Sequence, residues 1–252
     1  MKIGAQFYNL RDFCKTPEAL EESIKKVADI GFSAIQLSGT CNYDPSRIKK
    51  VLDECALTCC LTHRPYTEIK DDIDNCIENH RILGCKYIGL GSHNSLVNES
   101  DLEDLISVAH TSGRKMAEQG FKFMYHNHSG EFNRNDKGLT RLEVLLSETT
   151  PDELGITLDT YWLHHAGCDL NDWIPLLSGR IPCVHFKDMK MFGNEVRMAP
   201  VGHGNLPFEK YLPLCEGAGA EYIIAEQDNA YGEDPFEELK KSYLYLKSLG
   251  LE

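Results

Sequence analysis

The stretch Tyr125-His-Asn-His-Ser-Gly-Glu-Phe132 ends an apolar run that begins at Phe121. We interpret this run as a β-strand, and alternate residues of a strand point to the same face. His126 and His128 therefore project to one side, with Met124 beneath them. Two imidazoles on one strand face suit a metal site or a proton-transfer site, although a pair of hydrogen-bonded core histidines would give the same pattern.

Three further strand-like runs carry similar polar groups at their ends. Leu158-Asp-Thr-Tyr161 supplies an acid, Val184-His-Phe-Lys-Asp188 a His and a Lys on one face, and Ile224-Ala-Glu-Gln-Asp228 two carboxylates. The steps along the chain are 33 residues (126 to 159), 26 (159 to 185) and 41 (185 to 226). A strand, a helix and two loops take roughly 30 residues. The spacing predicts that these groups lie at the tops of four successive strands in a repeating βα architecture.

Strand-like and helix-like segments alternate along the whole chain. The predicted strands span residues 2–8, 33–37, 57–62, 85–90, 121–128, 154–159, 181–187 and 222–226. The predicted helices span residues 17–30, 44–56, 71–83, 100–119, 139–147, 162–177, 207–218 and 234–249. Residues 188–206 are predicted to be a long loop, and loops of that length are usually functional. The alternation indicates parallel strands, and the even count with a closing helix favours a single (β/α)8 barrel over a doubly wound open sheet.

Composition and charge narrow the class of protein. The chain has 252 residues, of which 42% are hydrophobic and 26% are charged, and its formal net charge is −13. Such a charge disfavours nucleic acid and membrane surfaces as partners, because both attract basic proteins. The chain has ten cysteines without CxxC spacing, no leader-like N-terminus and no apolar run near the ~20 residues that cross a bilayer. We therefore expect one cytoplasmic domain over residues 1–252, with reduced thiols.

The chain resembles the sugar phosphate isomerase/epimerase family, within the xylose isomerase-like barrel superfamily. Six segments carry the resemblance: Gly4-Ala-Gln-Phe-Tyr-Asn-Leu-Arg11, Tyr125-His-Asn-His128 with Glu131-Phe132, Leu158-Asp-Thr-Tyr-Trp162, His185-Phe-Lys-Asp188, Pro200-Val-Gly-His-Gly204 and Glu226-Gln-Asp228. The resemblance implies a divalent metal (Mn, Co, Zn, Mg or Fe) at the barrel mouth. Its ligands in the family are commonly Glu, Asp, His and Glu from strands five to eight. Asp159, His185 and Glu226 match the last three places, and His126 stands in the first.

The histidine in the first ligand place bears on the chemistry. In family members that epimerise or isomerise, two metal-bound glutamates are thought to exchange the substrate proton. This chain keeps only Glu226, and Glu131, five residues beyond His126, is the candidate substitute. Some keto-inositol dehydratases of the superfamily are also rich in histidine on this strand, so a lyase is the alternative to an isomerase.

Further candidate residues surround the expected ligands. Lys187 could stabilise an enolate oxygen and His128 could move a proton, unless they only form an ion pair and support the ligands. Asp228 shares a strand face with Glu226 and could orient a substrate hydroxyl. The remaining substrate-binding candidates are aromatic residues or lie at strand ends and in the long loop: Tyr161, Trp162, Gln6, His63, His93, Arg197 and His203. The Gly202-His-Gly204 pair alone is too weak a signal for phosphate binding.

The residues together predict a metal-dependent isomerase or epimerase that acts on a sugar or keto-sugar through an enediolate. Glu226 or His128 would remove the proton beside the carbonyl, and Lys187 would hold the enediolate. Loss of a β-hydroxyl from the same intermediate would make the enzyme a dehydratase. The same barrel could also serve as a non-catalytic carbohydrate-binding protein or as a nuclease, and the negative charge disfavours the nuclease. The expected partner is a small carbohydrate, and a homo-oligomer is compatible with exposed barrel faces.

Overall fold

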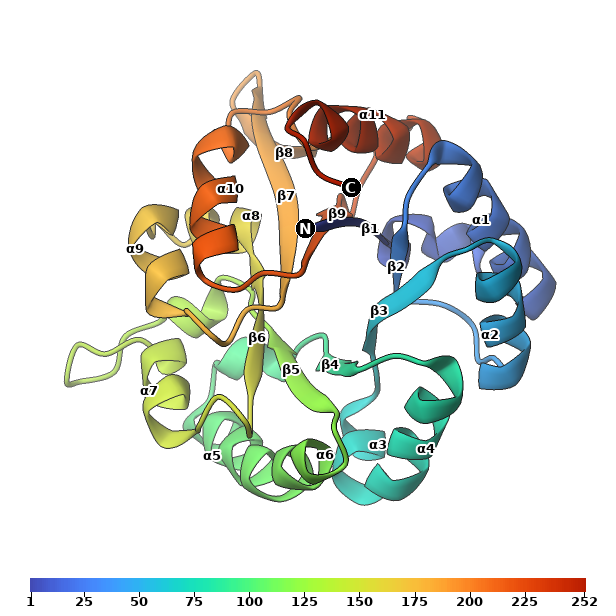
Figure 1. Ribbon diagram of the computed structural model, residues 1–252. Coiled ribbons are helices and arrows are strands. Elements are labelled where there is room, and N and C mark those ends of the chain that lie inside the picture. Colours follow the sequence, from blue (N-terminus) through green and yellow to red (C-terminus); the bar gives the residue numbers. More distant parts are fainter.

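A closed ring of eight parallel strands forms the centre of the computed structural model, which describes residues 1–252 (Figure 1). The strands pair in the order β6-β5-β4-β3-β2-β1-β9-β7, and a further β6–β7 pairing closes the ring. They are β1 (Lys2–Gln6), β2 (Ala34–Leu37), β3 (Thr58–His63), β4 (Tyr87–Leu90), β5 (Lys122–His126), β6 (Gly155–Asp159), β7 (Cys183–Phe192) and β9 (Tyr222–Glu226). The predicted (β/α)8 barrel is confirmed.

Helices surround this ring (Figure 1). They are α1 (Pro17–Ile30), α2 (Pro45–Glu54), α3 (Tyr66–Asp71), α4 (Ile73–Leu83), α5 (Glu99–Val108), α6 (Arg114–Glu118), α7 (Arg141–Glu148), α8 (Thr160–His165), α9 (Leu170–Leu176), α10 (Phe208–Gly217) and α11 (Pro235–Ser248). Short 3-10 turns lie at η1 (Phe7–Phe13), η2 (Asn94–Leu96) and η4 (Gly130–Phe132). None of the helices combines the length and the apolar character that crossing a membrane requires.

The helix predicted for residues 100–119 is interrupted. A π-turn, η3 (Ala109–Gly113), separates α5 from α6. Gly113 lies against the backbone of Glu153, whose carbonyl oxygen would be 2.1 Å from an added Cβ. Only glycine fits at this approach, whereas the apolar period of the sequence continues through the turn and gives no sign of it.

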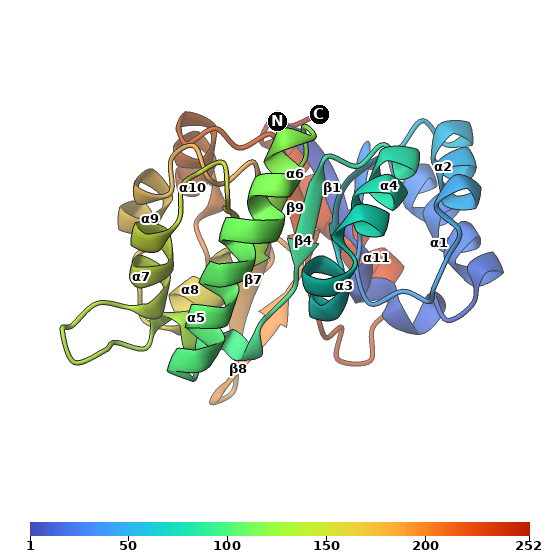
Figure 2. The same cartoon turned by 90° about the horizontal axis from the view of Figure 1, so that it is seen from below.

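The prediction of a loop for residues 188–206 is wrong over its first part. β7 continues to Phe192 and returns as the antiparallel strand β8 (Glu195–Ala199). Gly193, at φ 59°, supplies the left-handed backbone that a two-residue hairpin turn favours. The hairpin projects beyond the ring of helices on the side opposite both chain termini (Figure 2).

Inside the barrel, the inward side chains change from apolar to polar along the strands, towards their carboxyl ends. One buried cluster inside the barrel consists of Ala34, Cys60, Leu61, Tyr87, Met124, Cys183 and Ile224. Two residues further along β5, β7 and β9, the inward positions are His126, His185 and Glu226. Because strand residues two apart share a face, these polar groups stand on an apolar floor at the carboxyl ends of the strands. This is the end of the barrel at which TIM-barrel enzymes place their active sites.

Candidate metal centre

Four buried side chains meet at the carboxyl ends of β5, β6, β7 and β9. Each of His126, Asp159, His185 and Glu226 offers one ligand atom, and these atoms all lie within 4.8 Å of one another. His126 Nε2 lies 3.3 Å from Asp159 Oδ2, and His185 Nδ1 lies 2.7 Å from Glu226 Oε2. No member is more than 4% exposed. The structure therefore brings the sequence-predicted ligands together, and their role as ligands stays a prediction.

The two imidazoles are held from behind by oxygen acceptors. His126 Nδ1 lies 2.9 Å from the Gly91 carbonyl oxygen, and His185 Nε2 lies 2.6 Å from Gln36 Oε1. These oxygens only accept hydrogen bonds, so the ring nitrogens that face them carry the protons. When each ring carries only that proton, its other nitrogen presents a lone pair to the centre. Metal-binding histidines are commonly oriented in this way.

The centre contains buried polar atoms that lack hydrogen-bond partners, and this supplies a test of whether a metal fits. They include His185 Nδ1 and Glu226 Oε2. The two atoms are close, but a neutral ring protonated at Nε2 has no proton to donate between them. Leaving a buried polar atom unsatisfied costs about 1–3 kcal/mol. A divalent cation would satisfy both atoms, and mixed nitrogen and oxygen donors suit Mn, Fe, Co or Zn. The residues present therefore fit the implied metal.

A buried ion-pair network lies beside the centre. Lys187 Nζ is 2.6 Å from Asp228 Oδ2, 3.6 Å from Asp159 Oδ2 and 3.8 Å from Glu226 Oε2. Burial alone would lower the pKa of Lys187, but the carboxylates of Glu226, Asp159 and Asp228 together raise it. Burial, and then the nearby Glu226 carboxylate, raise the pKa of Asp228 to about 6. Lys187 is therefore a fixed ammonium at the edge of the centre.

Two further imidazoles face the same space. The His128 ring centroid lies 4.7 Å from that of His126 and 5.3 Å from that of Trp162. Burial lowers the pKa of His128 to about 3, so this ring is neutral near pH 7. His63, at the end of β3, lies with its Nδ1 3.1 Å from Ser38 Oγ. His128 Nδ1 and His63 Nε2 have no partner within the protein. Both atoms are therefore buried polar groups whose hydrogen-bonding capacity the protein itself leaves unused.

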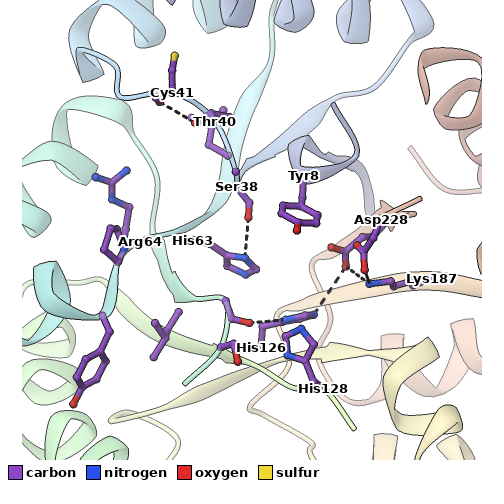
Figure 3. A pocket seen from close by; sticks show the side chains of 18 of the residues that line it. Tyr8, Ser38, Thr40, Cys41, His63, Arg64, His126, His128, Lys187 and Asp228 are labelled. Carbon is purple, nitrogen blue, oxygen red and sulfur yellow. Dashed lines mark hydrogen bonds and ion pairs between the residues drawn. The ribbon is translucent and has the colours of Figure 1, made fainter. Parts of the chain in front are cut away.

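A cavity of about 700 Å³ opens above these groups (Figure 3). Ligand pockets are typically 300–1,000 Å³, so its size suits a small molecule. Most of the predicted catalytic and binding residues line it, together with the candidate ligand His126: His63, His126, His128, Trp162, Lys187, Glu226 and Asp228. Residues from the loops after β1, β2 and β3 complete the lining, among them Tyr8, Ser38, Tyr43, Arg64 and Tyr66. Asp159 and His185 lie buried beneath this lining.

Some predicted substrate-binding residues lie outside the cavity lining. Gln6 is fully buried, and its Oε1 accepts the backbone N–H of Tyr8 at the start of η1. The His93 ring stacks on Tyr66 at 4.2 Å between centroids, and its Nε2 lies 3.5 Å from Asp104. Both side chains hold local structure here, and a contact with substrate stays a prediction for each.

The candidates from the predicted loop also lie away from the centre. Arg197, on β8, pairs with Glu195 at 2.9 Å, and its guanidinium lies over the rings of Phe192 and Tyr231. His203 is exposed on the loop that follows β8. The hairpin directs Arg197 towards its own aromatic neighbours, which an open loop at these residues would not do.

Glu131 forms hydrogen bonds that hold the residues on either side of the candidate ligand His126. Its carboxylate is buried and accepts hydrogen bonds from the Tyr125 hydroxyl at 2.6 Å and from the backbone N–H of His128 at 2.9 Å. Burial raises the pKa of Glu131, although these two bonds oppose the shift. The position therefore fits a group that fixes the loop beyond His126, and a direct acid–base role stays a prediction.

Two groups that orient the imidazoles were not among the sequence-based candidates. Gln36 could have been found, because it is the one polar residue of the apolar run Ala34–Leu37. Gly91 acts through its carbonyl oxygen, which no side-chain pattern reveals. Its lack of a side chain also matters, since a Cβ there would lie 2.9 Å from His63 Nδ1.

Asp188 organises the loop that contains the Gly202-His-Gly204 motif. Its carboxylate is buried and accepts four backbone N–H groups, those of Met189, Gly202, Gly204 and Leu206. A Cβ on Gly204 would lie 2.4 Å from Asp188 Oδ1, so glycine is required where the loop approaches the carboxylate. The motif therefore has a structural explanation within the protein.

The chain matches known proteins over most of its length. A family model described as xylose isomerase-like TIM barrel matches residues 24–249. The chain belongs to this family. The same xylose isomerase-like barrel is found in a sugar phosphate isomerase/epimerase from Parabacteroides distasonis, with a TM-score of 0.80, 22% identity, and coverage of 98% of this chain and 94% of that chain.

Further similar proteins carry different names. An L-ribulose 3-epimerase matches with a TM-score of 0.76 at 15% identity, covering 98% of this chain and 94% of that chain. An inosose dehydratase from Clostridium beijerinckii is 22% identical over an alignment of 267 residues, covering 90% of this chain and 88% of the relative. At such identities the structural likeness shows the fold alone.

Proposed function

We propose that this protein is a divalent-metal-dependent enzyme that enolises a small hydroxy-ketone carbohydrate, with isomerisation or epimerisation as the outcome. The proposal rests above all on the unsatisfied atoms His185 Nδ1 and Glu226 Oε2, which lie directly below a cavity of suitable size. A purely structural ion-pair network would satisfy such atoms internally. Relatives named as an epimerase and as an inosose dehydratase support the same broad class of substrate.

The roles of the chain's residues follow from their positions. His126, Asp159, His185 and Glu226 would hold the ion, which when bound would supply Lewis-acid polarisation of a substrate carbonyl. Lys187 places a positive charge beside the position of an enediolate oxygen, where a fixed charge stabilises the transition state. Because Lys187 is already held by carboxylates, little reorganisation is needed when that charge develops.

Proton removal falls to Glu226 or His128. Burial opposes ionisation of Glu226, but the Lys187 ammonium holds the pKa of its carboxyl well below the usual range. His128 is neutral, and its Nδ1 has no partner in the protein. Trp162 closes the side of the cavity next to His128, and its ring can pack against an apolar face of the substrate.

Dehydration is the second candidate, and the asymmetry of the site favours it. Proton exchange between two matched carboxylates would need a second glutamate, whereas His126 occupies that place. The groups that face the cavity instead include one ligand carboxylate, the neutral His128 imidazole and the Lys187 ammonium. In this arrangement His128 could take the proton beside the carbonyl and return it to a departing β-hydroxyl.

Incubation of the metal-loaded protein with a panel of ketoses and keto-inositols in D2O tests both candidates. An isomerase or epimerase yields a product with one deuterium and an unchanged skeleton by NMR. A dehydratase yields a product that has lost one water by mass spectrometry. If no member of the panel exchanges deuterium or loses water with any of the candidate metals, the proposed function is wrong.

A further inference from the structure

The charges around the cavity indicate which substrates it accepts. We propose that the site binds an uncharged polyhydroxy ketone as substrate. Glu68 excludes phosphorylated sugars because its carboxylate forms an ion pair with the guanidinium of Arg64. This inference rests on the proposed function and adds the charge class of its substrate. Glu68 lies outside the cavity lining and belongs neither to the candidate ligands nor to the acid–base groups.

Arg64 and Lys187 are the two Lys or Arg residues of the cavity lining. The Nε and Nη2 atoms of Arg64 donate to Glu68 Oε2 at 3.0 and 2.7 Å. The pair is largely shielded, with side chains 26% and 16% exposed. A forked guanidinium–carboxylate pair uses the same donors that would bind a phosphate. Glu68 therefore occupies the Nε/Nη2 edge of the guanidinium and neutralises its charge.

The rest of the positive charge is also matched. Lys187 has three carboxylates within 3.8 Å. With a divalent ion in place, the charges of the ion, Lys187 and Arg64 equal those of four carboxylates, Asp159, Glu226, Asp228 and Glu68. A phosphate ester would add about two negative charges without an unpaired cation to receive them. The net charge of −13 on the whole chain adds to this repulsion.

Backbone donors that could bind a phosphate are occupied too. TIM barrels frequently bind phosphate in the loops that follow strands seven and eight. Here the N–H groups of Gly202, Gly204 and Leu206 donate to the Asp188 carboxylate at 3.0, 2.8 and 3.1 Å. An internal carboxylate thus takes the place of a ligand anion in this loop.

The groups left free in the cavity suit hydroxyls and C–H faces. His63 adds its ring to the lining, and its Nδ1 lies 3.1 Å from Ser38 Oγ. Trp162 adds an uncharged indole ring to the lining. Tyr8 and Tyr43 add aromatic surface to the lining, and Figure 3 shows Tyr8 across the cavity from His128. Such walls bind the apolar faces of a sugar and leave its hydroxyls to polar neighbours.

The first measurement is binding, which does not depend on turnover. Inorganic phosphate is titrated by calorimetry into the metal-free protein, so that no ion can bind the phosphate directly. We expect no affinity in the millimolar range for the wild type, and a gain of about tenfold or more for Glu68→Gln, which frees Arg64. The double variant Glu68→Gln with Arg64→Gln should lose this gain.

The second measurement compares matched substrates. Metal-loaded protein is assayed with D-fructose against D-fructose 6-phosphate, and D-ribulose against D-ribulose 5-phosphate. We expect kcat/KM to favour the free sugar of any accepted pair by about tenfold or more, and Glu68→Gln to narrow that ratio. Glu78→Gln is the matched control, because it breaks an exposed ion pair with Arg81 and should change neither measurement.

The outcomes separate this inference from the proposed function. Sub-millimolar binding of phosphate by the wild type, or a preference for the phosphorylated sugar, overturns the charge exclusion and leaves an enolising enzyme in place. Turnover of no substrate, with phosphate still unbound, refutes the proposed enzyme and leaves the exclusion standing. If Glu68→Gln does not fold, Arg64→Gln decides through the substrate pairs. We expect it to leave the ratio of kcat/KM between the free and the phosphorylated sugar unchanged, and a fall in kcat/KM for the phosphorylated sugar alone would show that Arg64 receives an anion and overturn the inference.

Discussion

Gln36 Oε1 and His185 Nε2 lie 2.6 Å apart, which joins β2 to β7 across the interior of the barrel. The two strands are not neighbours in the ring, because β1 and β9 lie between them. The bond places the ring proton on Nε2 and turns the Nδ1 lone pair towards Glu226. The orientation of one candidate ligand therefore depends on a strand that carries none of the others.

Gln36→Leu should weaken metal binding without removing a ligand. The His185 ring would lose the acceptor that fixes its proton and its orientation, and changes of this kind typically cost 10–100-fold in metal affinity. Competition against a chromogenic chelator measures the effect. Thr62→Val is the control, because it removes a buried hydrogen bond to His80 instead of one to His185. Equal affinities for Gln36→Leu and wild type would contradict the role given to Gln36.

Asp159→Ala should abolish stoichiometric metal binding, as measured by elemental analysis of the dialysed protein. Asp159 also caps α8, since its Oδ1 accepts the Trp162 backbone N–H at 2.9 Å. Asp169→Ala is therefore the matched control, because Asp169 caps α9 through the Asn171 N–H at 2.9 Å without facing the centre. Each variant loses a cap worth about 1 kcal/mol, and only the first should lose metal. Full occupancy in Asp159→Ala would remove this residue from the ligand set.

Lys187→Met should leave the metal in place and lower kcat by about a hundredfold or more, because the enediolate would lose a fixed positive charge. Steady-state kinetics on an accepted substrate, with metal content measured in parallel, gives the result. Lys241→Met, which breaks a surface pair with Glu238, should have no effect on kcat. An unchanged rate in Lys187→Met would assign Lys187 only to charge balance among the buried carboxylates.

His80 should make stability fall between pH 6.5 and 4. The ring is 2% exposed, bonds to Thr62 Oγ1 and the Cys76 carbonyl oxygen, and has a pKa lowered by burial to about 4. Below pH ~6.5 His80 becomes protonated in the unfolded chain, whereas in the folded chain it stays neutral down to about pH 4. The free energy of unfolding should therefore drop by about 3 kcal/mol across this window as pH falls.

Urea unfolding at pH 7 and pH 4.5 checks this prediction. His80→Gln should lose stability at both pH values but show a smaller difference between them than wild type. His164→Gln, at an exposed histidine, should keep the wild-type difference. A pH difference in His80→Gln as large as that of wild type would show that other groups cause it.

The barrel could be predicted because apolar runs alternate with amphipathic segments from end to end. The hairpin was missed because Met189 to Phe192 alternates only weakly, although Gly193-Asn194 between two short runs is a known hairpin signal. The meeting of the four candidate ligands could be predicted because each lies at the polar end of an apolar run, where alternation fixes the direction of a side chain. His93 lies beyond the end of β4, and Arg197 lies on β8, outside the barrel. Their stacking on nearby aromatic residues is not encoded in residue spacing.

β9 is inserted between β1 and β7 and carries Glu226. The other three candidate ligands lie on the consecutive strands β5, β6 and β7. Without β9 the ring is open and the fourth candidate ligand is missing. The strand that completes the ring thus also carries the fourth residue that would hold the ion. A bound ion would link β7 to β9 through His185 and Glu226. Its release during gentle denaturation would then report the separation of these two strands.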